Sequence, residues 1–196
     1  MLYKRKVGGN EMDDSIMFTI QSGYFLMPVL LIYVLYTTLG VILKYKKRSI
    51  GQFFVLTTFC VYLLCVIHLV LFPIEVNIGK FANLTPWYKV INFVPILTLD
   101  MKTFLLNIIM FIPLGIYLPL LKNKFNSANK VAYLALFFSL SIEVFQLIMR
   151  IVFGNGRSTD INDLIANTFG GIIGYLILKT LLKSKWWNDL LNKMKL

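Results

Sequence analysis

Residues 141–167 read SIEVFQLIMRIVFGNGRSTDINDLIAN, a stretch that places carboxylates, amides and arginines within and beside long apolar runs. A membrane-spanning helix needs about 20 mainly apolar residues to cross a hydrocarbon core of about 30 Å, and the runs on both sides of the central Gly-Asn-Gly are long enough. Ionisable groups at such depth are costly unless they pair, face the interior of a helix bundle or meet water. The stretch therefore predicts a helical membrane protein whose polar groups face its interior.

The composition of the whole chain favours the same fold class. Of its 196 residues, 58% are apolar and only 15% are charged, which is far from the usual balance of a soluble domain. A chain of this length holds about five spans with short connections and no separate soluble domain. We therefore predict an all-α integral membrane protein, a bundle of about five transmembrane helices with an interfacial C-terminal helix. The expected spans are residues 23–43, 51–72, 103–121, 131–153 and, from 160 or 161, to 182.

The chain divides into three segments, which are a polar N-terminal segment, 1–17, a single transmembrane domain, 18–182, and an interfacial basic tail, 183–196. The tail, KSKWWNDLLNKMKL, pairs tryptophans with lysines, as interfacial amphipathic helices do. In the middle of the last span, Gly170, Gly171 and Gly174 form the small-residue pattern that lets membrane helices approach closely. The longest connection, 73–102, carries an aromatic pair and is expected to lie on the membrane surface.

The net charge of +11 is concentrated in short segments between the apolar runs. Lysines and arginines cluster at 44–48, at 122–130 and from 179 onward, and a chain with five spans places these three segments on one side of the membrane. The positive-inside rule makes that side cytoplasmic, so the N-terminus is expected outside and the C-terminus in the cytoplasm. Because the basic residues flank membrane spans, we expect no nucleic-acid partner.

Three of the expected helices bring polar groups to similar depths when each residue counts as about 1.5 Å of rise from the basic side. Asn107, Glu143 and Asn167 fall at roughly 18–22 Å, and Gln146 and Asp163 fall about one layer further out. Within each helix these groups share one face. The pattern predicts an outward-facing polar pocket. Its expected binding residues are Asn107, Glu143, Gln146, Asp163 and Asn167 around the cavity, with Arg150, Arg157 and Asp160 at its rim.

The same residues carry a family pattern. NIIMFIPLG at 107–115, the pair Glu143 and Gln146, and GRSTDINDLIANTFGGIIG at 156–174, preceded by NFVPIL at 92–97, resemble the VanZ-like family of bacterial membrane proteins. The resemblance covers the signature region 92–174. The matching positions are Asn107, Phe111, Pro113, Gly115, Glu143, Gln146, Arg157, Asp160, Asp163, Asn167, Gly170 and Gly174. Since the family is named for a teicoplanin-resistance protein, the resemblance implies a Gram-positive-type plasma membrane and protection against lipidated glycopeptides, without a mechanism.

Metal and cofactor chemistry is weakly indicated. His68 has no companion His or Cys at ligand spacing, which argues against a zinc site. The carboxylates could hold a hard divalent cation, but acids beside arginines are equally explained by ion pairing. We expect no metal and no cofactor. In a purely structural alternative, Arg150 and Arg157 pair with nearby acids to lock the helices together.

Two functions of different classes remain open. The first is a binding module whose pocket takes the headgroup of a membrane lipid, a lipid-linked cell-wall precursor or a lipoglycopeptide antibiotic. The second is a membrane-embedded enzyme that acts on an outer-leaflet lipid or lipid-linked precursor. Its candidate catalytic residues are Glu143, Asp160 and Asp163, because burial adapts a carboxylate to general acid–base work.

Overall fold

Five long apolar helices dominate the architecture and confirm the predicted all-α class. The computed structural model describes residues 15–42, 49–96 and 100–196. Each of the five is long and apolar enough to cross a membrane, and a sixth, amphipathic helix follows them. The helices are α1 (Gly23–Ile42), α2 (Ile50–Leu71), α3 (Met101–Leu121), α4 (Ala128–Phe153), α5 (Ile161–Leu181) and α6 (Lys185–Met194).

Polar residues at the helix ends set the boundaries within a few residues of the predicted ones. Ser49 caps α2 in a reciprocal arrangement with Gln52, which satisfies backbone donors of the first turn. Asp100 accepts hydrogen bonds from two backbone amides and caps α3, whose first residue, Met101, lies two residues before the predicted start. At the other end of α4, Gly154 adopts a left-handed conformation (φ 60°) that ends the helix.

Helix α5 packs most extensively against α3 and next against α4. Its contact face is the predicted glycine face. A Cβ on Gly170 or Gly174 would overlap the backbone carbonyl of Ile108 or Ile112 in α3, and a Cβ on Gly115 would overlap the carbonyl of Gly171. The two helices therefore touch backbone to backbone, as small residues permit in a membrane where there is no hydrophobic drive between helices.

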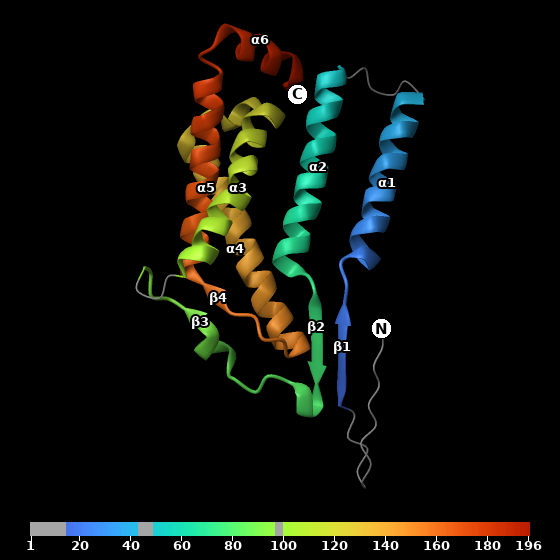
Figure 1. The fold of residues 1–196 in the computed structure, drawn as a ribbon, viewed down its shortest axis with the longest axis vertical. Helices are drawn as coiled ribbons and strands as arrows, with labels where there is room; N and C mark the ends of the chain where they lie inside the picture. The colour runs from blue at the N-terminus through green and yellow to red at the C-terminus, as the bar shows by residue number, and fades with distance from the viewer. Residues whose placement is uncertain (1–14, 43–48, 97–99) are drawn as a thin grey trace.

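The apolar core lies beside this contact and extends toward α6. Buried side chains of α3, α4 and α5 form its main cluster, which comprises Phe111, Leu114, Leu118, Val131, Ala135 and Tyr175. A second cluster joins Val55, Leu120 and Leu178 to Leu191 and Met194 of α6. The C-terminal helix thus docks across the ends of α2, α3 and α5, while α1 stands at the edge of the bundle beside α2 (Figure 1).

Two short strand pairs, which were not predicted, lie at the opposite end of the bundle from α6 (Figure 1). Strand β1 (Ile16–Ile20) pairs antiparallel with β2 (Ile74–Ile78), and β3 (Ile91–Asn92) pairs parallel with β4 (Thr159–Asp160). The connection 73–102 is therefore partly folded into strands and 3-10 turns. Of the predicted segment 1–17, residues 1–14 lie outside the described residues. We call the two ends of the bundle the strand end and the α6 end.

Candidate functional site

Acids and amides from three helices meet near the strand end. Asn107 of α3 donates through Nδ2 to Asp163 Oδ1 of α5 at 2.5 Å. Glu143 of α4, only 2% exposed, accepts a hydrogen bond at Oε2 from the backbone amide of Asp160 at 3.1 Å. The carboxylates of Glu143 and Asp163 also lie close enough to repel one another. Three of the predicted helices thus bring their polar groups into one cluster.

A second polar contact lies one turn deeper. Asn167 of α5 donates through Nδ2 to Ser139 Oγ of α4 at 2.9 Å, and both side chains are buried. Equal rise per residue had placed Asn167 level with Asn107, but Asn107 pairs with Asp163 instead. Among the described residues, the buried Asn167 Oδ1 has no hydrogen-bond partner. Buried amide oxygens are normally satisfied, so this atom marks a place for a polar group.

The segment around β3 closes over the start of α5. Asn92 Nδ2 donates to Asp160 Oδ1 at 3.0 Å, and the same carboxylate oxygen accepts the Asn162 amide at 2.8 Å as the helix N-cap. The buried Asn162 side chain in turn accepts the backbone amide of Ile96 at 2.8 Å. Ile96 has a φ of 69°, which is costly for a β-branched residue. Asn162 thus holds a strained turn against the cluster.

The arginines bind backbone carbonyls. Arg150 is 5% exposed and donates through Nη1 to the carbonyls of Arg157 at 2.7 Å and Asn155 at 3.4 Å. Arg157 Nη1 and Gln146 Nε2 both donate to the carbonyl of Val70, at 2.5 and 3.0 Å. That carbonyl needs partners because α2 ends at Leu71. In the described chain, neither arginine forms a hydrogen bond to a carboxylate, so the predicted lock of arginine–acid pairs is not observed.

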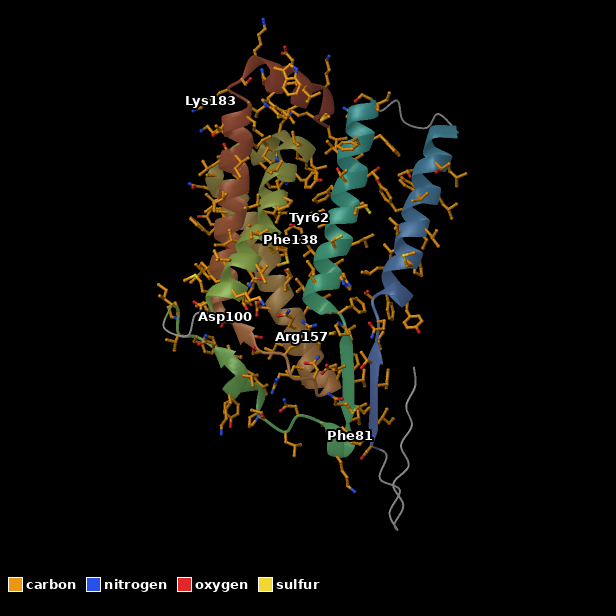
Figure 2. The ribbon with its side chains drawn as sticks, viewed as in Figure 1. Tyr62, Phe81, Asp100, Phe138, Arg157 and Lys183 are labelled. Atoms are coloured by element: carbon orange, nitrogen blue, oxygen red, sulfur yellow. The ribbon has the colours of Figure 1, made fainter. Side chains whose placement is uncertain are left out.

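Arg157 lies in the loop between α4 and β4, at the end of the bundle opposite Lys183 (Figure 2). Burial lowers the pKa of its guanidinium, and the carboxylate of Glu75 acts in the opposite direction. The Glu75 carboxylate on β2 therefore lies close enough to this loop to attract Arg157. The strand end holds charges of both signs close together.

A cavity of about 280 Å³ opens beside the end of α4. Its wall combines Arg150 and Gly154 with Asn77 of β2 and with Asn83 and Trp87 from the segment that follows β2. Asn77 Oδ1 is buried and has no hydrogen-bond partner in the part of the chain that the structure describes. Of the predicted binding residues, Arg150 lines this cavity, and the others do not belong to its lining.

Sequence reasoning missed several polar residues of the site. The missed residues are Asn77, Asn92, Ser139, Asn155 and Asn162. Asn155 is 2% exposed and accepts the Arg157 backbone amide at 3.2 Å, and its own Nδ2 has no partner among residues 15–42, 49–96 and 100–196. Asn92 and Asn162 did carry a signal, since each lies within a stretch that resembles the family pattern, 92–97 and 156–174. Asn77 lies outside that pattern.

This arrangement can hold polar and anionic groups. In the described residues, no group of three or more His, Cys, Asp or Glu side chains is arranged to hold a metal ion. A buried carboxylate such as Glu143 can accept or release a proton, and a buried guanidinium such as Arg150 can bind phosphate or carboxylate. The arrangement therefore offers hydrogen-bond donors and acceptors to a charged or polar group, and a carboxylate that can transfer a proton.

The region of the chain that carries these residues matches a known protein family. The sequence model of the VanZ/LLP1 family matches residues 59–183, which include every predicted binding residue. Protein VanZ of Enterococcus faecium is 34% identical over 120 residues, which cover 58% of this chain and 66% of that protein. The match thus spans slightly less than two thirds of the length of that relative. No solved structure matches the chain significantly.

Proposed function

This chain belongs to the VanZ/LLP1 family, and on that basis we propose that it binds the headgroup of a lipid or lipid-linked cell-wall precursor at its strand end. Its five apolar helices make it a multi-pass membrane protein, and the proposal puts it in a bacterial plasma membrane. Binding such a headgroup would lower susceptibility to teicoplanin-type lipoglycopeptides, which the sequence resemblance implies. The lipoglycopeptide itself is a further candidate ligand of the same site.

The proposed orientation puts the strand end outside the cell. At the α6 end the described chain carries one acid, Asp189, against a group of lysines. These are Lys122, Lys124, Lys130, Lys179, Lys183, Lys185, Lys193 and Lys195. Positive charge in short flanking segments favours the cytoplasmic side. The basic segment 44–48 lies outside the described residues.

Cysteine labelling tests this orientation. We expect an impermeant maleimide to label Leu84→Cys on intact cells, because Leu84 is 89% exposed at the strand end. Ser184→Cys, at the exposed start of α6, should react only after the membrane is permeabilised. Both substitutions are made in a background of Cys60→Ala and Cys65→Ala, which removes the native thiols. The reverse labelling pattern would place the site in the cytoplasm and end the proposal.

The buried guanidinium beside the cavity is the observation that carries the proposed binding. A guanidinium has five N–H donors, and in the described chain only Nη1 of Arg150 is engaged, by two carbonyls. Its remaining donors can serve a phosphate or carboxylate in the cavity that Arg150 lines. Trp87 in the same wall offers an aromatic face, and Asn77 offers an unpartnered acceptor. A charged, hydroxyl-bearing headgroup matches this combination.

Glu143 and Asp163 hold together the helices next to this cavity. Glu143 holds the Asp160 amide, and Asp163 holds Asn107, so the carboxylates connect α3, α4 and the start of α5. Apolar packing would stabilise a bundle without the desolvation cost of these charges. We infer that the acids are retained for recognition.

Charge-removing substitutions of the acids test the proposed function. Glu143→Gln and Asp163→Asn keep the shape of each side chain, so we expect normal membrane yield but a return to the teicoplanin susceptibility of cells lacking the protein. Asp189→Asn, exposed on α6, removes the same charge at the other end and should keep full protection. Minimum inhibitory concentration, yield and thermal unfolding are measured on the same variants.

Two outcomes of that experiment count against recognition. Full protection by well-folded Glu143→Gln and Asp163→Asn proteins would show that the charges are dispensable. Yield or thermal stability that falls in step with protection would assign the acids a purely structural role.

A second candidate function is an enzyme acting on an outer-leaflet lipid through Glu143, Asp160 or Asp163. The observation that favours it is the approach of the Glu143 and Asp163 carboxylates within a buried cluster, where one can act as a general base. Incubation of the purified protein with lipid-linked precursor separates the two functions. Released product that disappears with Glu143→Gln supports the enzyme, and stoichiometric binding without turnover supports the binding module.

A further inference from the structure

A second cavity lies at the α6 end, away from the site described above. It has a volume of about 380 Å³ and is a groove between the turn after α3 and the start of α4. Its wall consists of Lys124, Phe125, Lys130, Tyr133 and Leu134. The groove thus combines two ammonium groups with aromatic and aliphatic side chains. The wall contains no acid.

The charges of both lysines are available to a ligand. Lys130 Nζ donates to the neutral Asn126 Oδ1 at 3.3 Å, and Lys124 Nζ lies 4.9 Å above the ring centre of Phe125. Within the described residues, neither lysine forms a salt bridge with a carboxylate. An anion entering the groove would meet two unneutralised positive charges.

The backbone that carries these lysines is held in place. Tyr175 of α5 is 8% exposed and donates its hydroxyl to the carbonyl of Asn126 at 2.7 Å. Phe125 packs against the main apolar cluster. Lys124 lies in the 3-10 turn η3 (Asn123–Phe125), and Lys130 lies in the first turn of α4. The groove is therefore pre-organised, which reduces the entropy lost on binding.

The length of α4 places the groove among lipid headgroups. Its 26 residues extend about 39 Å, whereas a hydrocarbon core is about 30 Å thick, so the end turns of the helix lie outside the core. Tyr133 stands about 8 Å along the axis from Ala128, at the depth where aromatic side chains gather. The lysines would then face the phosphate layer.

An exposed apolar face continues from the groove toward the membrane centre. Tyr133, Phe137, Leu140 and Val144 recur at helical spacing on α4 and are 75%, 62%, 49% and 47% exposed. A soluble anion has no apolar part that could pack against this face. An acyl chain would lie along it while its phosphate stays between the lysines.

We propose that this groove binds an anionic phospholipid of the leaflet at the α6 end, with Lys124 and Lys130 holding the phosphate and the α4 face taking an acyl chain. Basic pockets between membrane helices bind anionic lipid headgroups in this manner. The groove is independent of the strand-end site, so the two proposals stand or fall separately.

Native mass spectrometry of the purified full chain tests the groove. With phosphatidylglycerol added, we expect one lipid to bind before others, and phosphatidylcholine to bind more weakly. Lys124→Gln combined with Lys130→Gln should weaken this first binding about 10- to 30-fold. Each lysine near a membrane surface strengthens the binding of anionic lipid several-fold, and the variant loses two of them. Both side chains are exposed, so the variant should fold normally, which thermal unfolding verifies.

The matched control is Lys179→Gln combined with Lys183→Gln, which removes the same charge from the α6 end outside the groove. It should change the first binding less than twofold. Three outcomes overturn the proposal. These are an equal loss in the control pair, equal affinity for phosphatidylcholine, and displacement of the lipid by glycerol phosphate, which would mean that the lysines bind a free anion.

Discussion

Replacing Gly174 with alanine is expected to lower the free energy of unfolding by about 3 kcal/mol and to reduce the yield of folded protein sharply. The added Cβ would overlap the backbone carbonyl oxygen of Ile112, and it would lie 3.1 Å from the Cα of Gly115. Backbone atoms cannot rotate away as a flexible side chain can. The whole of α3 would have to move from α5, which also separates Asn107 from Asp163.

Thermal unfolding of purified protein measures this effect, with Gly40→Ala as the matched control. Gly40 lies in α1, and a Cβ there meets no atom of the described residues within 4 Å. Alanine is favoured over glycine in a helix interior by about 1 kcal/mol, so the control should be as stable as the parent or slightly more so. An unchanged melting temperature for Gly174→Ala would show that α3 and α5 do not touch backbone to backbone.

Replacing Arg150 with leucine is expected to cost about 2–4 kcal/mol of stability and to remove headgroup binding. The guanidinium donates hydrogen bonds to the carbonyls of Asn155 and Arg157, and both carbonyls would lose this donor. They belong to the loop that leads into β4 and so to Asp160. Losing Arg150 therefore loosens the cluster and removes the positive charge from the cavity wall.

Arg157→Leu is the comparison variant, because it makes the same substitution at an arginine whose carbonyl acceptor has a second donor. Its Nη1 shares the Val70 carbonyl with Gln146 Nε2, so that acceptor keeps a partner after the substitution. We expect a cost of about 1 kcal/mol, measured by thermal unfolding together with limited proteolysis of the loop 154–158. Equal destabilisation by the two substitutions would contradict the central position assigned to Arg150.

The helix boundaries show how far local patterns reach. All five spans were predicted, but α3 and α4 begin two and three residues earlier than expected, at Met101 and Ala128. Lysines and asparagines in those first turns interrupt the apolar run, and the helices extend through them to Asp100 and Ser127. Hydropathy detects the membrane core, whereas the helix itself continues to the residue that ends its hydrogen bonding.

The structure brings some of the predicted pocket residues together, but their hydrogen-bond partners are not those that depth alone suggested. Facing positions on α3, α4 and α5 brought Asn107, Glu143 and Asp163 together, as counting rise and angle indicated. The partner of each donor depended on the inclination and offset of the helices, which no single helix encodes. Asn107 therefore bonds to Asp163, and Asn167 bonds to Ser139.

The sequence by itself determined the five apolar spans, the glycine face of α5 and the set of helices that carry polar groups, because each depends on residues close together in the chain. Tertiary structure alone decided that both arginines bind backbone carbonyls, that β3 pairs with β4, and that the cavity lies beside Arg150. A backbone carbonyl is open to an arginine only where it lacks a backbone partner, as at the end of α2 and in the loop after α4. Every residue carries a carbonyl, so no side-chain pattern marks these acceptors in advance.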